Sequence, residues 1–309
     1  MKRFNKITII GVGLIGGSIG LLLKRRNIAR RVVGVGHHES SIYKAVRLKA
    51  IDEGTLDLRK GIAGADIVIL ATPILSMPGI VKRAKPFFKK GAIVTDVGSA
   101  KRSISAQIER LLPRGVSFVG GHPMAGSEKR GVEKARGDLF RNSICILTKG
   151  PATPAGSLRR IKNMWLALGA NITTLSARAH DRIVAEISHL PHMVIFSLLS
   201  CIDKENLAFA STGLYDAARI ASSDALIWRD IAISNKDEII KSISKFKKSL
   251  AQLEKAVRNE DSANLARIFK KAQEKRAVIA RSVATKQSQE IASLRSSREA
   301  GSRHAGQRR

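Results

Sequence analysis

The sequence of 309 residues contains little cysteine and few aromatic side chains. It has two cysteines, Cys145 and Cys201, and aromatic residues make up 4% of the chain. The two thiols lie far apart without the spacing of a metal or redox motif, so we expect both to be small buried apolar side chains in a reducing compartment. This cysteine usage predicts a cytoplasmic protein.

Long apolar runs are also missing from the sequence. We find none of the length needed to cross a membrane, and the hydrophobic content of 44% is typical of a soluble globular protein. The sequence therefore predicts no membrane association. Its length allows two domains with ample apolar core.

Acidic residues are heavily outnumbered: 55 Lys and Arg stand against 25 Asp and Glu, a formal net charge of +30. Such a charge fits nucleic acid, a membrane surface or an acidic small molecule as the partner. The basic residues are spread over the whole chain, and the sequence has neither an aromatic platform for stacking RNA bases nor a zinc knuckle. We therefore predict an anionic small-molecule substrate and no specific nucleic-acid binding.

A glycine-rich stretch near the N-terminus has a dinucleotide-binding pattern. The apolar run at 7–10 is typical of a buried strand, and it leads into GVGLIG at 11–16 and then into helical spacing. Gly11 allows the tight turn, Gly13 lets the backbone approach a pyrophosphate, and Gly16 lets the helix pack on the strand. The helix N-terminus then faces the phosphate. The predicted cofactor-binding residues here are Gly11, Gly13, Leu14, Ile15 and Gly16.

Strand and helix patterns alternate up to about residue 175. Strands are predicted at 7–10, 32–35, 65–71, 92–95, 117–119, 143–148 and 171–175. This alternation predicts an α/β fold with a doubly wound, parallel, Rossmann-type sheet over 1–175. Helical periodicities at 177–203, 205–222, 224–258 and 261–281 predict an all-helical second domain over 176–280. The Ser-, Arg- and Gln-rich residues 281–309 are predicted to be a basic, disordered tail.

The end of the second strand bears on the choice of cofactor. Gly36 occupies the position where an acidic residue usually binds the ribose 2′-hydroxyl of NAD. Without that carboxylate a 2′-phosphate is not repelled, and His37, His38 or Ser40 is able to bind it. Glu39 is close enough to serve NAD instead, so the sequence allows both NAD and NADP.

Ligands of such sheets bind outside the carboxyl ends of the strands. Thr72 and Pro73 follow one strand there, beside the expected cofactor. His122 follows another, where a histidine is able to take a proton from a substrate hydroxyl while hydride leaves the same carbon. The alternative is a histidine that only fixes its loop through backbone contacts.

The helical region contains further candidates. His189 and His192 are three residues apart, but no acidic or cysteine partner stands at ligand spacing and Pro191 interrupts the helix, so we predict no metal site. Arg219, followed by Trp228, is of the residue type suited to binding a carboxylate in bidentate fashion. A surface salt bridge is the other interpretation of Arg219.

Four segments in fixed order carry a more specific likeness: DVGSAK at 96–101, GHPMAGSE at 121–128, SHLPH at 188–192, and Arg219 followed by WRDI at 228–231. With them the chain resembles the prephenate dehydrogenase family, including its arogenate and cyclohexadienyl relatives, from the glycine-rich turn to about residue 275. Residues after about 280 have no counterpart in the family.

The resemblance implies an oxidative decarboxylation in tyrosine biosynthesis: hydride leaves the ring carbon that bears the hydroxyl, carbon dioxide is lost, and an aromatic ring forms. It implies that His122 is the base or polariser and that Ser99 bonds the same hydroxyl. It also implies a homodimer built through the helical domain and a dianionic substrate. The implied substrate-binding residues are Arg219, which holds a carboxylate, with His192, His189, Glu128 and Trp228.

Two other functions compete with this one. A dehydrogenase of the β-hydroxyacid type shares the two-domain plan, but it would carry a catalytic lysine in the long helix after the sheet. That helix offers Ser188, His189 and His192 instead. A non-catalytic dinucleotide-binding protein is the second alternative, and the intact His122 and Ser99 argue against it.

Overall fold

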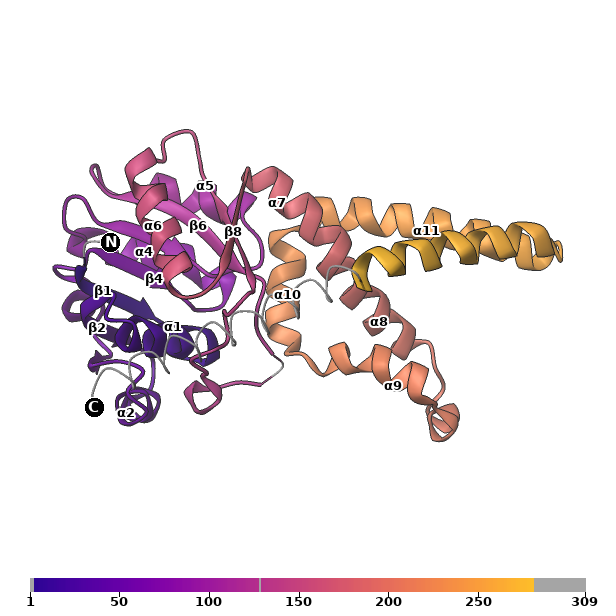
Figure 1. The fold of residues 1–309 in the computed structure, drawn as a ribbon, viewed down its shortest axis with the longest axis horizontal. Helices are drawn as coiled ribbons and strands as arrows, with labels where there is room; N and C mark the ends of the chain where they lie inside the picture. Colours follow the sequence, from indigo (N-terminus) through magenta and orange to yellow (C-terminus); the bar gives the residue numbers. More distant parts are fainter. Residues whose placement is uncertain (1–2, 128, 281–309) are drawn as a thin grey trace, which may run out of the picture. The chain divides into compact units, whose positions relative to one another are not determined.

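The computed structural model describes residues 3–127 and 129–280, and its first region is built on one eight-stranded sheet (Figure 1). The strand order is β3-β2-β1-β4-β5-β6-β7-β8. The strands are β1 (Phe4–Ile10), β2 (Ala29–Val35), β3 (Glu53–Thr55), β4 (Ile67–Leu70), β5 (Ile93–Asp96), β6 (Ser117–Pro123), β7 (Ile144–Thr148) and β8 (Asn171–Leu175).

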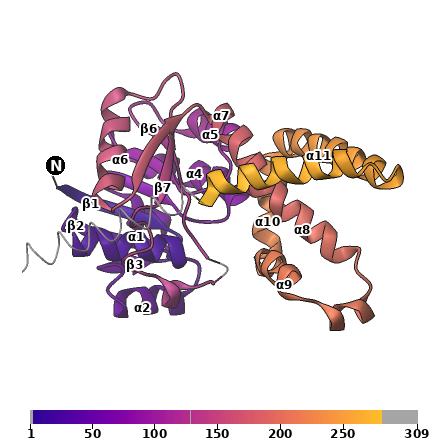
Figure 2. The same cartoon turned by 45° about the vertical axis from the view of Figure 1, so that its right-hand side comes forward.

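The sheet is mostly parallel, as the alternation of strands and helices predicts. One pair departs from this pattern: β7 runs antiparallel to β6, and the two lie side by side in Figure 2. Of the residues between them, 124–127 and 129–143 are described, and these contain only the short 3₁₀ turn η3 (Val132–Lys134) rather than the crossover helix that a parallel pair requires. Strand β3 was not predicted, because three half-buried residues at the sheet edge show no apolar periodicity.

Helices cover both faces of the sheet (Figure 1). The buried apolar side chains accordingly form two clusters, one shared with α1 and α6 and the other with α4 and α5. Alternate residues of β1 enter the two clusters, Ile9 the first and Ile10 the second. The doubly wound prediction is confirmed. The helical elements are α1 (Leu14–Arg25), α2 (Glu39–Arg47), α3 (Leu58–Ile62), η1 (Ile74–Ser76), α4 (Met77–Ala84), η2 (Lys85–Phe87), α5 (Arg102–Leu111) and α6 (Ala155–Ala167).

From residue 176 onward, the described residues contain helices and 3₁₀ or π turns but no strand. The predicted helix 224–258 is interrupted at Asn235, where the backbone leaves the helical conformation (φ −118°, ψ 29°) and the side chain donates to the Asp181 carbonyl. The elements are α7 (Ala177–Val184), η4 (Ala185–His189), α8 (Leu190–Ser200), η5 (Lys204–Phe209), α9 (Thr212–Ala218), η6 (Arg219–Ser222), α10 (Ala225–Ser234) and α11 (Lys236–Arg258), followed by a helix over 262–280.

The prediction that Pro191 interrupts the helix between the two histidines was wrong. Helix α7 continues through the π turn η4 into α8, and Pro191 lies in the first turn of α8. Proline has no N–H to donate to a carbonyl one turn earlier, and the wider π turn takes up this irregularity without ending the helix. His189 and His192 therefore lie on one continuous helical stretch.

This stretch also corrects the expectation about apolar runs. Residues Ala177–Ser200 form one helix of 24 residues with a mean hydropathy of 1.4 in its most apolar window, long and apolar enough to span a membrane by length and composition. Only 17% of that window is buried within the chain. This helix does not stand out as a long apolar run in the sequence because charged and polar residues are interspersed among the apolar ones.

By its contacts the chain divides into two compact units, and the first, residues 1–242, contains the sheet and the helices up to the start of α11. The predicted domain boundary at 175/176 stays a prediction, and the predicted tail at 281–309 lies outside the described residues. Of the two cysteines, Cys145 is buried as expected. Cys201 is exposed, because it follows the C-terminal end of α8.

Candidate active site

The glycine-rich turn joins β1 to α1. Gly11 has φ +94°, and a Cβ on it would come within 2.5 Å of the Ala71 carbonyl oxygen. A Cβ on Gly16 would come within 2.1 Å of the Gly11 carbonyl oxygen, so this contact closes the helix onto the turn. Gly13 caps the N-terminus of α1, and nothing lies within 4 Å of where its Cβ would be. The open space at a helix N-terminus fits a dinucleotide phosphate.

A small pocket adjoins this turn at the carboxyl ends of β1 and β2. Its volume is about 110 Å³, and its lining includes four residues named from the sequence: Gly11, Gly36, His37 and Thr72. Pro73 is exposed beside it. Arg83, from the last turn of α4, also lines the pocket and was missed, because nothing in the sequence ties that turn to β2. The described lining residues include this one arginine and no carboxylate, so nothing there repels a 2′-phosphate.

A buried ion pair supports the loop that follows β5. Lys101 is 1% exposed, and its Nζ donates to Asp96 Oδ2 at 2.5 Å and to the Gly98 carbonyl at 2.6 Å. Asp96 Oδ1 accepts from the Gly121 backbone N–H of β6 at 3.0 Å. Charge-assisted bonds in a buried site are short and directional. They therefore tie the loop that carries Ser99 to the strand that carries the candidate histidine.

His122 lies within β6, not in a loop after it, because the strand continues four residues beyond the predicted 117–119. Its side chain is 7% exposed, and its Nδ1 is 2.8 Å from Nε2 of His180. Among the described residues, Nε2 of His122 has no hydrogen-bond partner. Burial, followed by the neighbouring His180 and Lys101, holds the pKa of His122 well below its usual range. The imidazole is therefore neutral at pH 7 with one nitrogen available.

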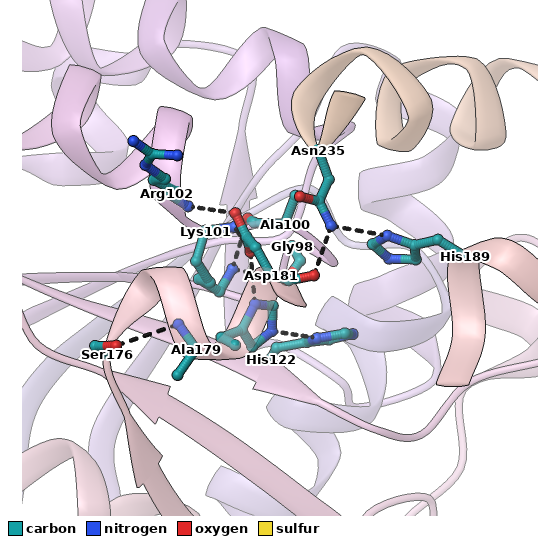
Figure 3. A network of polar contacts seen from close by, with 12 residues as sticks. Gly98, Ala100, Lys101, Arg102, His122, Ser176, Ala179, Asp181, His189 and Asn235 are labelled. Carbon is teal, nitrogen blue, oxygen red and sulfur yellow. Dashed lines mark hydrogen bonds and ion pairs between the residues drawn. The ribbon is translucent and has the colours of Figure 1, made fainter. Parts of the chain in front are cut away.

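Two residues at this site were missed by the sequence analysis. His180 Nδ1 is 2.7 Å from Asp181 Oδ1, and both residues belong to α7. The Asp181 carboxylate also accepts the backbone N–H groups of Lys101 and Arg102 at 2.8 Å each, at the N-terminus of α5 (Figure 3). The only signal in the sequence is an adjacent His-Asp pair at the start of a helix, and neither residue belongs to a motif.

His189 is held on the other side of this network. The Asn235 side-chain amide donates to His189 Nδ1 at 3.1 Å and to the Asp181 carbonyl at 2.9 Å (Figure 3). Burial lowers the pKa of His189 to about 4, and an interaction with the Ser99 backbone opposes that shift. The ring therefore lies near the Ser99 backbone, and the resemblance placed His189 among the substrate-binding residues.

The other candidate residues gather beside His189. The rings of His192 and Trp228 are stacked with centroids 3.6 Å apart, and the His189 ring meets Trp228 edge-on at 6.0 Å. His192 Nδ1 donates to the Ser188 carbonyl at 2.9 Å. Burial is the main cause that lowers the pKa of His192, and the positive charge of Arg219 adds to it. Arg219 itself is exposed at the start of η6.

The structure thus brings His122, Ser99 and His189 into one connected network, with His192, Trp228 and Arg219 next to it. Glu128 lies outside the described residues. Within the described ranges, no group of three or more His, Cys, Asp or Glu is placed to hold a metal ion.

The fold and site define a class of protein: a dehydrogenase with a parallel dinucleotide-binding sheet, a helical segment after it, and a neutral histidine at the edge where the strands end. β1, β4, β5 and β6 are parallel, so the glycine turn and His122 lie at the same edge. Comparison with known families narrows this class. The family profile "Prephenate dehydrogenase, nucleotide-binding domain" matches residues 19–174, and "Prephenate dehydrogenase, dimerization domain" matches residues 176–271.

Individual relatives agree. The chain is 36% identical to a prephenate dehydrogenase of Bacillus subtilis over 87% of this chain and 75% of that protein. It is 30% identical to a cyclohexadienyl dehydrogenase of Zymomonas mobilis over 89% and 96% of the two chains. The crystal structure of a prephenate dehydrogenase from A. aeolicus with hydroxyphenyl propionate and NAD+ matches with a TM-score of 0.85 at 34% identity, over 90% of this chain and 99% of that one. The chain belongs to the prephenate dehydrogenase family, whose members are NAD(P)-dependent oxidoreductases.

Proposed function

We propose that this protein catalyses the oxidative decarboxylation of prephenate, arogenate or both, with hydride transfer to NAD+ or NADP+. The observation that carries the proposal is His122: a buried, neutral imidazole whose Nε2 has no partner among the described residues, at the sheet edge that also carries the glycine turn. General-base catalysis at neutral pH needs such a nitrogen.

In the proposed reaction, His122 Nε2 takes the hydroxyl proton as the hydride leaves the ring carbon and that oxygen becomes a carbonyl. The bond to the carboxylate then breaks, its electron pair makes the ring aromatic, and the proton returns to the oxygen. The bound oxidised nicotinamide supplies the hydride acceptor. Gly11, Gly13 and Gly16 fit its phosphates, as the open space at Gly13 supports. Leu14 and Ile15 begin α1, whose N-terminus would face those phosphates, and His37, Thr72 and its neighbour Pro73 would hold the ribose end.

The substrate-binding half of the proposal rests on the cluster around Trp228. Ser99 bonds the reacting hydroxyl, and Arg219 holds a side-chain carboxylate. His192, stacked on Trp228, offers Nε2 as a polar contact, since its Nδ1 is already bonded. His189 supports Ser99. Glu128, outside the described residues, is assigned a gating role by family resemblance alone.

Removing the Arg219 side chain should weaken substrate binding more than turnover. We expect Arg219→Ala to raise KM for the dianionic substrate roughly 10- to 100-fold, because a hydrogen bond to a charged group contributes about 1.5–3 kcal/mol. Arg219→Lys should recover part of the lost substrate affinity, because lysine keeps the positive charge but cannot bind a carboxylate in bidentate fashion. Steady-state kinetics with Arg110→Ala, an exposed arginine of α5, provide the control. An unaltered KM would remove Arg219 from the site.

The helical segment supports a second part of the proposal, a homodimer in the cytoplasm. The dimerization profile covers 176–271, and only 17% of the most apolar window of its helix Ala177–Ser200 is buried within one chain. We propose that a second copy covers this surface, that residues 1–175 bind the dinucleotide, and that residues 176–280 provide substrate contacts and the dimer interface. Sedimentation velocity should give twice the chain mass; a monomer, or partition into lipid vesicles, would contradict the dimer.

The reaction itself is tested by absorbance at the reduced-nicotinamide band. Purified protein is mixed with prephenate or arogenate and with NAD or NADP, in all four combinations. We expect an absorbance increase in at least one mixture, and the relative rates rank substrate and cofactor together. Folded protein that is silent in all four would overturn the proposed function.

A further inference from the structure

The mechanism above uses one nitrogen of His122 and leaves the residues behind it without a role. His180 and Asp181 are both buried, at 0% and 1% exposure, and they stand in line with the proposed base. Burying polar groups is costly unless they are fully bonded. A buried imidazole and a buried carboxylate directly behind a base therefore need a reason.

The hydrogen bonds of Asp181 and His180 determine where the protons on these two side chains lie. The Asp181 carboxylate accepts from two backbone N–H groups, so it presents only acceptor oxygens to the His180 ring. His180 Nδ1, 2.7 Å from Oδ1, must then carry a proton. Burial lowers the pKa of His180, which keeps the ring neutral and makes its Nε2 an acceptor.

The contact between His180 and His122 determines where the proton of His122 lies. His180 Nε2 is 2.8 Å from His122 Nδ1, and a contact of that length between two nitrogens needs one proton between them. His180 has no proton on that side, so His122 Nδ1 must donate. A neutral imidazole carries a proton on only one of its two nitrogens, so Nε2 of His122 is unprotonated and has a free lone pair.

We propose that His180 and Asp181 are positioning residues that hold His122 in its Nδ1–H tautomer, with Nε2 free to act as the base. This rests on the proposed function only where it concerns turnover; the tautomer itself is a property of the resting protein. When Nε2 takes a proton, His122 gains a positive charge close to Lys101 and His189, which oppose it. The neutral His180 ring, hydrogen-bonded to Asp181, keeps its Nε2 lone pair as the acceptor for His122 Nδ1 while that charge develops.

The tautomer is read directly by nitrogen-15 NMR of the imidazole rings in the resting protein. We expect the Nδ1 of His122 to have the shift of a protonated ring nitrogen and Nε2 that of a bare one, with His122→Asn identifying the signals. A proton on Nε2 instead would overturn the proposal. This measurement needs no substrate, so its failure is separate from a failure of the proposed reaction.

The positioning role of His180 is tested by measuring turnover in two variants of this residue. His180→Phe keeps a buried ring but removes the acceptor, and we expect kcat to fall at least roughly tenfold, toward the 10²–10⁴ range of a lost general base. His180→Gln should remain within roughly tenfold of the parent. The amide nitrogen of the new glutamine donates to Asp181, and its amide oxygen then accepts from His122 Nδ1 as the imidazole nitrogen did. KM for both substrates should change little in either variant.

The control and the pH profile exclude a purely structural role. Phe140→Leu removes a ring that is equally buried in the apolar cluster beneath the sheet, and it should lower the melting temperature without changing kcat. In His180→Phe the acid limb of kcat/KM should also move, since Lys101 and His189 still face His122 but its acceptor is gone. Equal losses of kcat in the Phe and Gln variants, or no loss in the Phe variant, would overturn the proposal.

Discussion

Replacing His122 with asparagine should lower kcat by roughly two to four powers of ten, the usual contribution of a positioned general base. Dinucleotide binding should remain near normal, because the glycine turn belongs to β1 and α1 and shares no hydrogen bond with this ring. Stopped-flow kinetics and equilibrium titration of the cofactor measure the two effects separately. Ser117→Ala, at the opposite end of β6, is the control variant and should retain parental kcat.

The pH dependence of the parent protein follows from the same residue. His122 must be neutral to accept a proton, and its pKa lies well below the usual value because of burial and its neighbours. Activity should therefore persist as the pH falls through about 6.5, the ordinary histidine pKa, and decline only further into the acid range. An acid limb at or above that value, or unchanged turnover in the asparagine variant, would remove His122 from the role of base.

Gly13→Val should abolish dinucleotide binding without unfolding the protein. The backbone at Gly13 is extended with a negative φ of −86°, and nothing lies within 4 Å of its Cβ position. The added side chain would occupy the space that fits the phosphate and displace it from the backbone N–H groups. Losing two charge-assisted hydrogen bonds costs about 3 kcal/mol or more, so we expect Kd to rise at least roughly 100-fold.

Calorimetric titration measures this loss, and a matched variant separates it from general damage. Gly79→Val also places a side chain in open space, but on the exposed surface of α4. It should bind dinucleotide with parental affinity. Equal affinity in both valine variants would show that the glycine turn does not hold the cofactor, whereas a fall in melting temperature confined to Gly13→Val would point to folding instead.

The parts of the fold that the sequence predicts are those with contiguous signals. The glycine turn, the buried strands β1 and β4, and the switch to helices after residue 175 each follow from neighbouring residues. Strand β3 and the antiparallel direction of β7 were missed, although the strand at 143–148 itself was predicted. A three-residue edge strand buries too little apolar surface to be patterned, and strand direction is determined by how the intervening chain returns.

The residues of the candidate site likewise fall into those that the sequence predicts and those that it does not. His122, Ser99 and Arg219 lie in recognisable motifs, so their positions were named from sequence. His180, Asp181 and Asn235 act through contacts between elements 46 to 80 residues apart, such as the bond from the Lys101 N–H to Asp181. No local pattern encodes such a pairing. Arg83 was missed because its place in the pocket depends on the end of α4 and the end of β2 meeting there.

The position of Asp181 has a consequence for how this protein can be taken apart. Its carboxylate caps α5 of the dinucleotide-binding region, yet it belongs to the first helix after the sheet. A fragment ending at residue 175 would keep the glycine turn and His122 but lose the partner of that histidine. Any chimera made by joining the sheet of one family member to the helices of another inherits half of this contact from each parent. The junction therefore has to follow α7 rather than precede it.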